Sequence, residues 1–172
     1  MPMPPKAPLK NSKGIEINYF QKLAELVKPY LLQEEIKLDF TGYGQTLLDY
    51  QNLEDSDINK ARKLAVELNS WSEYVSSLAN LIQKLYLDSE TEKNEKISSV
   101  SCSCDGKTVA NGDRLANKNP DVVKARKKRN ILKSLYEELN NKVEFLNRAY
   151  YHCKQTIEWE TKVRENNNII NR

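Results

Sequence analysis

The tendency of this chain to form helices is clearest in residues 119–159, NPDVVKARKKRNILKSLYEELNNKVEFLNRAYYHCKQTIEW. Asn119 is a good N-cap, Pro120 suits the first helical turn, and Asp121 complements the positive end of a helix. The positions that follow at alternating spacings of three and four residues are apolar or aromatic, except for Arg129. This pattern predicts one long helix over residues 120–159 with a continuous face to bury.

A second long helix is predicted over residues 57–87, where Ser56 and Asp57 are candidate N-caps. Apolar residues again recur three and four apart, from Ala61 to Leu85. Long helices with continuous apolar faces are not stable alone in water, so the two faces must be buried on each other or on another copy. We therefore expect an all-α fold in which two long helices form an antiparallel coiled-coil-like hairpin.

The remaining segments suggest smaller features. A short amphipathic N-terminal helix is expected within residues 15–33, ended or kinked at Pro29. One face of this helix would carry Tyr19, Leu23, Leu26 and Val27. Residues 88–118 are too long for an ordinary connection. Because β-branched residues surround Asp105-Gly106, a favoured two-residue turn, we expect a small β-hairpin or projecting arm there, after a flexible acidic run.

The domain boundaries follow from these features. Residues 1–14 are expected to be a flexible Pro/Lys-rich tail, residues 15–160 a single helical domain, and residues 161–172 a polar C-terminal tail. No apolar run approaches the roughly 18–20 residues that cross a bilayer. The start of the chain has no apolar core of a secretory signal, and three cysteines do not suggest a disulfide framework. We expect a cytoplasmic protein without membrane contact, in the host cytoplasm if it is encoded by a phage.

Positive charge is concentrated in one part of the chain. Between Lys107 and Lys133 there are nine basic and two acidic residues, a net charge of +7, whereas the whole chain carries +3. The rest of the chain therefore carries −4. Such a segregated basic patch is typical of proteins that bind nucleic-acid phosphates, although a solvated helix face or an acidic protein partner also accounts for it.

Ten basic residues are candidates for contact with nucleic acid. They are Lys84, Lys107, Arg114, Lys118, Lys124, Arg126, Lys127, Lys128, Arg129 and Lys133. Most lie in the first turns of the last helix, whose N–H groups also attract anions. Arg129 occupies a position where an apolar residue would pack better, so it is expected either to snorkel or pair with an acid of another helix, or to reach a phosphate.

Aromatic residues next to basic ones can stack on the bases of a single strand. Tyr150, Tyr151 and Trp159 are candidates for this role. Tyr150 falls on the apolar face of its helix, as do Trp71 and Tyr136, so packing is the preferred interpretation for these three. Tyr151 and Trp159 remain open to either interpretation.

No catalytic or metal-binding motif is evident. Cys102, Cys104, His152 and Cys153 have ligand chemistry, but their spacing matches no zinc pattern, and adjacent His152 and Cys153 point about 100° apart on a helix. There is no Gly-rich phosphate loop, and no nucleophile lies beside a base. We expect no enzyme activity, no metal and no cofactor.

The order of features between about residues 64 and 157 resembles the UvsY-type recombination mediators of tailed phages. A Trp-bearing helix is followed by a charged gap, by GKTVANGDRLANKNPDVV, and by a last helix containing CKQTI. The resemblance implies a small, helical, ring-forming protein that binds single-stranded DNA and helps a recombinase displace single-strand-binding protein. The family's Lys-Ala-Arg motif has its counterpart in letters at Lys124-Ala125-Arg126, but its expected place is in the preceding helix, where Lys84 is the positional match.

The sequence therefore favours a self-associating accessory protein that binds single-stranded DNA or RNA, with a phage recombination mediator as the specific form of this hypothesis. Its expected partners are the nucleic acid, further copies of itself, a recombinase and single-strand-binding protein. The alternative is a helical structural or assembly protein, such as a virion component, that acts through protein–protein contacts.

Overall fold

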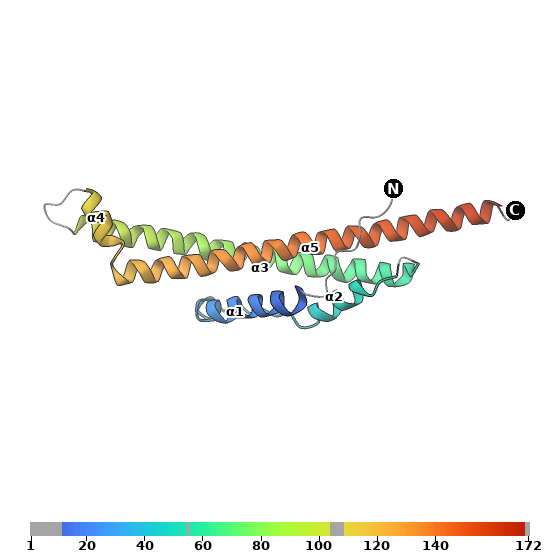
Figure 1. Cartoon of the computed structure of the whole chain (residues 1–172), viewed down its shortest axis with the longest axis horizontal. Helices are drawn as coiled ribbons and strands as arrows, with labels where there is room; N and C mark the ends of the chain where they lie inside the picture. The colour runs from blue at the N-terminus through green and yellow to red at the C-terminus, as the bar shows by residue number, and fades with distance from the viewer. Residues whose placement is uncertain (1–11, 55, 104–108, 171–172) are drawn as a thin grey trace. The chain divides into compact units, whose positions relative to one another are not determined.

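The computed structural model of the chain describes residues 12–54, 56–103 and 109–170, and every regular element in these ranges is an α-helix. The all-α prediction is therefore confirmed for the described residues. Figure 1 shows the helices. The chain forms two compact units, one of Met1–Lys37 with Ile82–Tyr136 and one of Leu38–Leu81 with Glu137–Arg172. No helix in the described ranges is long and apolar enough to cross a membrane.

Five helices occur in chain order. They are α1 (Ser12–Gln33), α2 (Tyr43–Gln51), α3 (Ile58–Cys102), α4 (Val109–Ala116) and α5 (Pro120–Ile170). The two long helices each contribute to both units, because each unit takes one part of α3 and one part of α5.

The predicted start of α3 is confirmed. The Asp57 carboxylate accepts a hydrogen bond from the backbone N–H of Lys60 at 2.9 Å, so Asp57 is the N-cap of α3. Before α2, Gly42 has φ 87°, a left-handed conformation that is costly for a residue with a Cβ. This glycine lets the chain turn into α2.

In the first unit, side chains of α3 contact side chains of α5. The Tyr86 ring stacks on Tyr136 with centroids 6.5 Å apart, and the Glu92 carboxylate meets the Lys128 ammonium at 2.8 Å. The N-terminal helix α1 also contacts α5, since the Lys128 ammonium lies 5.7 Å from the centre of the Tyr30 ring.

The second unit repeats this arrangement with α2 as the third helix. The Ser72 hydroxyl of α3 donates to the Asn147 side chain of α5 at 2.7 Å. The Tyr50 hydroxyl of α2 lies 3.3 Å from His152 Nδ1, and the Tyr50 ring packs edge-on against Phe145. In both units, therefore, a shorter helix covers the pair formed by α3 and α5.

The predicted apolar faces supply most of the core. The buried members are Ala61, Leu64, Leu68, Val75, Leu78 and Ile82 of α3, and Val122, Ala125, Leu132, Leu139, Leu146 and Cys153 of α5. Leu135 and Ala149 are buried as well, although they lie beside the predicted line. The buried stripe is wider than a two-helix seam because each unit has a third helix to cover it.

The predicted boundary of α3 at residue 87 is wrong, and the expected flexible acidic run is helical. α3 continues to Cys102, and the residues of the acidic run make helical ion pairs three and four apart, Glu90 with Lys93 and Glu92 with Lys96. Ser and Thr side chains in this stretch also bond backbone carbonyls within the helix, as Thr91 does to Leu87.

The described parts of the predicted arm contain no strand. Residues 88–102 belong to α3 and residues 109–116 form α4, which argues against a β-hairpin, while Lys107 and the Asp105-Gly106 turn lie outside the described residues. α4 packs closely on the end of α3, since a Cβ built on Gly112 would stand 3.1 Å from the Ser101 carbonyl oxygen. A Cβ at this position would require the Ser101 backbone to shift by a few tenths of an ångström.

Two further expectations need correction. α5 continues beyond residue 159 to Ile170, so the described part of the expected C-terminal tail is helical. In α1 the helix continues past Pro29 to Gln33, and Leu26, expected on the buried face, is 55% exposed. The buried face of α1 is instead formed by Leu23, Val27 and Leu31, because the spacing of four residues selects one side of the helix.

Candidate nucleic-acid interface

The basic segment begins at the capped start of α5. The Asn119 side-chain oxygen accepts hydrogen bonds from the backbone N–H groups of Asp121 at 2.9 Å and Val122 at 3.4 Å. The N–H of Val123 bonds the Asn119 carbonyl, and Pro120 has no N–H. The predicted cap is confirmed, but it uses the N–H groups of the first turn, so any anion must be bound by side chains.

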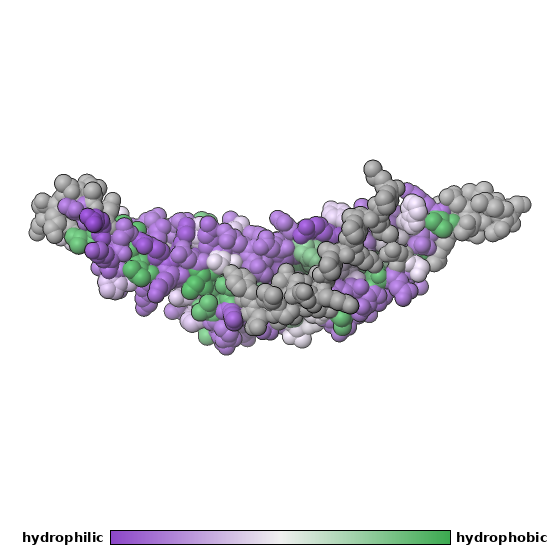
Figure 2. Space-filling view, in the orientation of Figure 1, coloured by the Kyte–Doolittle hydropathy of each residue, from purple (hydrophilic) through white to green (hydrophobic). Residues whose placement is uncertain are grey.

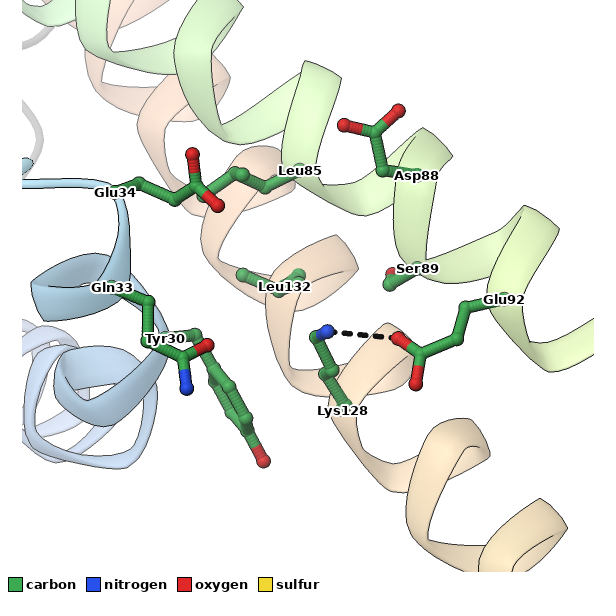
Figure 3. A pocket seen from close by; sticks show the side chains of 9 residues that line it. All are labelled: Tyr30, Gln33, Glu34, Leu85, Asp88, Ser89, Glu92, Lys128 and Leu132. Carbon is green, nitrogen blue, oxygen red and sulfur yellow. Dashed lines mark hydrogen bonds and ion pairs between the residues drawn. The ribbon is translucent and has the colours of Figure 1, made fainter.

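Two of the candidate cations are held by carboxylates of α3. The Lys128 ammonium lies 2.8 Å from one oxygen of Glu92 (Figure 3). The other oxygen of Glu92 lies 2.6 Å from the Lys96 ammonium. The Arg129 guanidinium lies 2.9 Å from Glu90, which also lies 3.6 Å from Lys93. These carboxylates are on the same stretch of α3 that the sequence had suggested was flexible.

Arg129 points into the contact between α3 and α5. Its side chain is 23% exposed, its guanidinium lies over the Tyr86 ring at 5.3 Å, and one of its nitrogens is 3.4 Å from the Tyr86 hydroxyl. The hydrogen bond from Arg129 is the main cause of a lowered pKa of Glu90. Of the two roles expected for Arg129, the structure therefore places it with an acid of another helix.

The Arg129 Nε atom is buried and has no hydrogen-bond partner among the described residues. A buried donor without a partner reduces the benefit of the ion pair. Arg129 therefore gains an ion pair but leaves a buried donor without a partner, at a position of the apolar face where an apolar side chain would pack better.

Other candidate cations remain exposed. Lys124 and Lys127 of α5, Lys118 of the connecting turn and Arg114 of α4 are all exposed, and no carboxylate of a described residue forms an ion pair with them. Exposed ammonium and guanidinium groups without an internal partner can bind phosphates without first breaking an ion pair.

The other three described candidates, Arg126, Lys133 and Lys84, differ from these exposed cations in burial or in position. Arg126 is half-buried and donates to the Asn117 side chain, and Lys133 is half-buried. Lys84 is exposed on α3, and no contact among the described residues joins it to the basic residues of α5. Arg126 and Lys133 are therefore less accessible than Lys124 and Lys127.

The positive charge of this end of the unit is only partly neutralised. Residues 114–133 contain eight basic residues and one acidic residue, a net charge of +7. Residues 85–102 of α3, which contain Glu90 and Glu92, have four acidic and two basic residues, a net charge of −2. The α3 segment thus offsets two of seven positive charges, and the surplus would attract a polyanion.

A small hollow of about 100 Å³ lies where α1, α3 and α5 meet (Figure 3). Glu34, Asp88 and Glu92 line it together with Lys128 and the buried Ser89. The acidic side chains of this hollow would repel a phosphate. The Lys128 ammonium forms its ion pair with Glu92 within the hollow. Lys128 is therefore a structural cation rather than part of the exposed basic set.

The two lysines beside Glu92 keep its carboxyl group ionised at low pH. Hydrogen bonds from Lys128 and Lys96 lower the pKa of Glu92 from 4.5 to about 2. Because the pKa is lower in the folded than in the unfolded chain, ionised Glu92 stabilises the fold above about pH 4.5, and this contribution disappears as the pH falls through about 2. We expect Glu92→Gln to reduce the dependence of stability on pH between about 4.5 and about 2. The midpoint of urea unfolding, measured at several pH values, tests this.

The matched control for this test is Glu95→Gln, which removes an exposed carboxylate on the same helix that has no ion pair among the described residues. The Glu92 side chain is 37% exposed, so salt should weaken the effect. Identical pH profiles for the two variants would contradict the role assigned to Glu92.

The cysteines and the histidine do not form a metal site among the described residues, which contain no group of three or more candidate metal ligands. Cys102 is exposed, whereas Cys153 is buried, and burial raises the pKa of its thiol to about 11. The Cys153 thiol is therefore protonated near neutral pH and packs as a small apolar side chain. Cys104 lies outside the described residues.

The aromatic residues divide as the sequence suggested. Tyr136 and Tyr150 are half-buried, and Trp71 is packed among Phe40, Tyr43 and Tyr74. Tyr151 is 61% exposed and Trp159 is 70% exposed. These two remain candidates for base stacking, whereas the first three contribute to packing.

The sequence reasoning missed Glu90 and Glu92 as partners of the basic segment. A signal was present in the alternating charges of ETEKNEK, which are spaced three and four apart as on a helix. Comparisons with known proteins add nothing to this description, since no family model, curated protein or solved structure matches the chain.

Proposed function

We propose that this chain is an accessory protein that binds single-stranded nucleic acid through the exposed cations around the start of α5. The observation that carries the proposal is the surplus positive charge of residues 114–133, of which the facing stretch of α3 offsets only a small part. A polyanion gains affinity from such a surplus because each neutralised phosphate releases counterions.

In this proposal the basic residues have two different tasks. Lys118, Lys124 and Lys127 bind phosphates, together with Arg114. Lys128 and Arg129 join α5 to α3 and hold the exposed cations in place. The exposed rings of Tyr151 and Trp159 lie in the second unit and are separate candidates for stacking on unstacked bases.

The proposal extends to self-association and to a role beside a recombinase, as in tailed-phage recombination mediators. Several copies would multiply weak phosphate contacts into a strong one. An antiparallel coiled-coil pairing of α3 and α5 is the arrangement that we infer for each copy, and we infer a non-catalytic role without a cofactor.

The test is a charge-neutralising triple variant, Lys118→Gln with Lys124→Gln and Lys127→Gln. Binding of a labelled single-stranded oligonucleotide is measured by fluorescence anisotropy at several salt concentrations. Each lost phosphate contact should reduce the slope of log affinity against log salt by about 0.7, so the triple variant should lose about 2 from the slope.

The matched control is Lys22→Gln with Lys37→Gln and Lys162→Gln, which removes the same charge from exposed lysines outside the basic segment. The proposal fails if the slope of log affinity against log salt is near zero for the unmodified chain. It also fails if the two triple variants reduce this slope by the same amount.

A helical assembly protein is the second candidate, because apolar side chains remain exposed on several helices. Leu32 is 66% exposed on α1 and Trp159 is 70% exposed on α5, and hydrophobic patches interrupt the visible hydrophilic surface (Figure 2). Such residues favour contact with another protein. Molar mass measured with and without oligonucleotide separates the candidates, since an assembly protein would associate without responding to nucleic acid.

A further inference from the structure

An apolar groove of about 410 Å³ lies on the surface of the second unit. Trp71, Tyr74 and Val66 of α3 line it, and Val66 is 68% exposed. Asp39 and Glu67 add carboxylates to the lining. The groove therefore combines aromatic rings, an exposed aliphatic side chain and negative charge, and it is separate from the basic segment.

The aromatic residues of the groove are held in place before any ligand binds. The Trp71 ring stacks on Phe40 and meets Tyr74 edge-on, with centroids 6.2 and 5.7 Å apart. The Trp71 indole N–H donates to the Thr46 hydroxyl at 3.2 Å, and the Tyr74 hydroxyl accepts from the Asp39 backbone N–H at 3.0 Å. A groove with fixed walls binds with little loss of conformational entropy.

The charge of the groove favours a cationic ligand. The Asp39 carboxylate accepts a hydrogen bond from the Thr41 backbone N–H at 2.9 Å, which lowers its pKa, and it has no ion pair among the described residues. Glu67 is only weakly compensated, with Lys63 at 3.8 Å. The rim is consequently negative at neutral pH, whereas the walls are apolar.

We propose that this groove binds a proline-rich segment that carries lysine or arginine. Proline rings pack well on fixed Trp and Tyr side chains, and an extended polyproline helix needs no hydrogen-bonding strand edge, which the described residues do not offer. The carboxylates of Asp39 and Glu67 would pair with the basic side chains of the segment.

The chain itself contains a segment of this composition. Residues 1–10, MPMPPKAPLK, have four prolines and two lysines and lie outside the described residues. A synthetic peptide with this sequence is therefore the natural probe. The inference does not depend on nucleic-acid binding, because the groove and the basic segment share no residue.

The experiment measures binding of the peptide to the full chain carrying Trp159→Phe, so that Trp71 is the only tryptophan that reports by fluorescence. We expect saturable binding with a change in Trp71 emission. Val66→Arg should weaken binding at least about tenfold, because it fills the groove and repels lysine, whereas Leu81→Arg, at an exposed position of the same helix, should leave it within about twofold.

Two altered peptides and one altered chain complete the design. A peptide with alanine for every proline and a peptide with glutamate for both lysines should each bind at least about tenfold more weakly. A chain whose own prolines in residues 1–10 are changed to alanine is titrated as well, so that its own segment does not compete for the groove.

Three results would overturn the inference. One is no binding of the proline-rich peptide to either chain. Another is that the alanine peptide binds as tightly as the proline-rich peptide, or that Leu81→Arg weakens binding as much as Val66→Arg. Either result would indicate general electrostatic attraction. The third is that Val66→Arg lowers the molar mass of the protein while the peptide does not bind. This result would indicate that the groove is a contact between copies of the chain.

Discussion

Replacing Leu132 by alanine is expected to lower the free energy of unfolding by about 2–5 kcal/mol. The Leu132 side chain has no exposed surface and lies on the α5 face that packs in the first unit. It lies between the ion-paired Arg129 and the stacked Tyr136 along the helix, where partners from α3 fix the position of the backbone. A cavity left there cannot close easily, because both neighbours are tied to α3. The midpoint of urea unfolding, followed by helical circular dichroism, measures the effect.

The matched control is Leu87→Ala, which removes the same atoms from a leucine of α3 that is 50% exposed. Its effect should remain within about 0.5 kcal/mol, as is usual for surface positions. Equal losses for the two variants would show that Leu132 is not in the core of the first unit.

The second large effect concerns glycine in two different surroundings. Alanine in place of Gly112 gains up to about 1 kcal/mol of helix propensity. Its methyl group, however, would stand 2.6 Å from the Ser101 hydroxyl oxygen and 3.1 Å from the Ser101 carbonyl oxygen. The hydroxyl can rotate away but the carbonyl belongs to α3, so the helices must separate at a cost of about 1–3 kcal/mol. We expect Gly112→Ala to be destabilising by up to about 2 kcal/mol.

Gly44→Ala provides the comparison, since Gly44 is also helical but has no atom within 4 Å of the added methyl group. This variant should raise the free energy of unfolding by up to about 1 kcal/mol, somewhat less because Gly44 lies in the first turn of α2. Thermal unfolding of the two variants should therefore shift in opposite directions. A rise in melting temperature for both would mean that α4 does not press on α3 at Gly112.

Local sequence signals predicted the parts of this fold that depend on neighbours a few residues away. Asp57 and Asn119 cap their helices as expected, because a cap involves only its own side chain and the next backbone N–H groups. The buried lines of α3 and α5 follow from helical periodicity alone. The end of α3 could not be predicted in this way, since ISSVSC has weak helix propensity, and a close approach of Gly112 in α4 to Ser101 lies at this end of the helix.

The candidate site was predicted only in part for the same reason. Lys124 and Lys127 are exposed as expected of a basic helix face, but Lys128 and Arg129 are withdrawn into ion pairs with residues 36 and 39 positions earlier. The residues next to Lys127 and Lys128 in the sequence do not show which of the two forms an ion pair. The orientation of each side chain relative to α3 decides this, and that orientation exists only once the helices have packed.

By itself, the sequence determined that this chain is helical, where α3 and α5 begin, and which faces they bury, because caps and the 3.6-residue period act within a few turns. The tertiary structure decided that Arg129 turns to Glu90, that α3 reaches Cys102, and that Trp71 lines a groove with Asp39 and Val66. These features join residues from distant parts of the chain, so their energies depend on packing between helices and not on any local propensity.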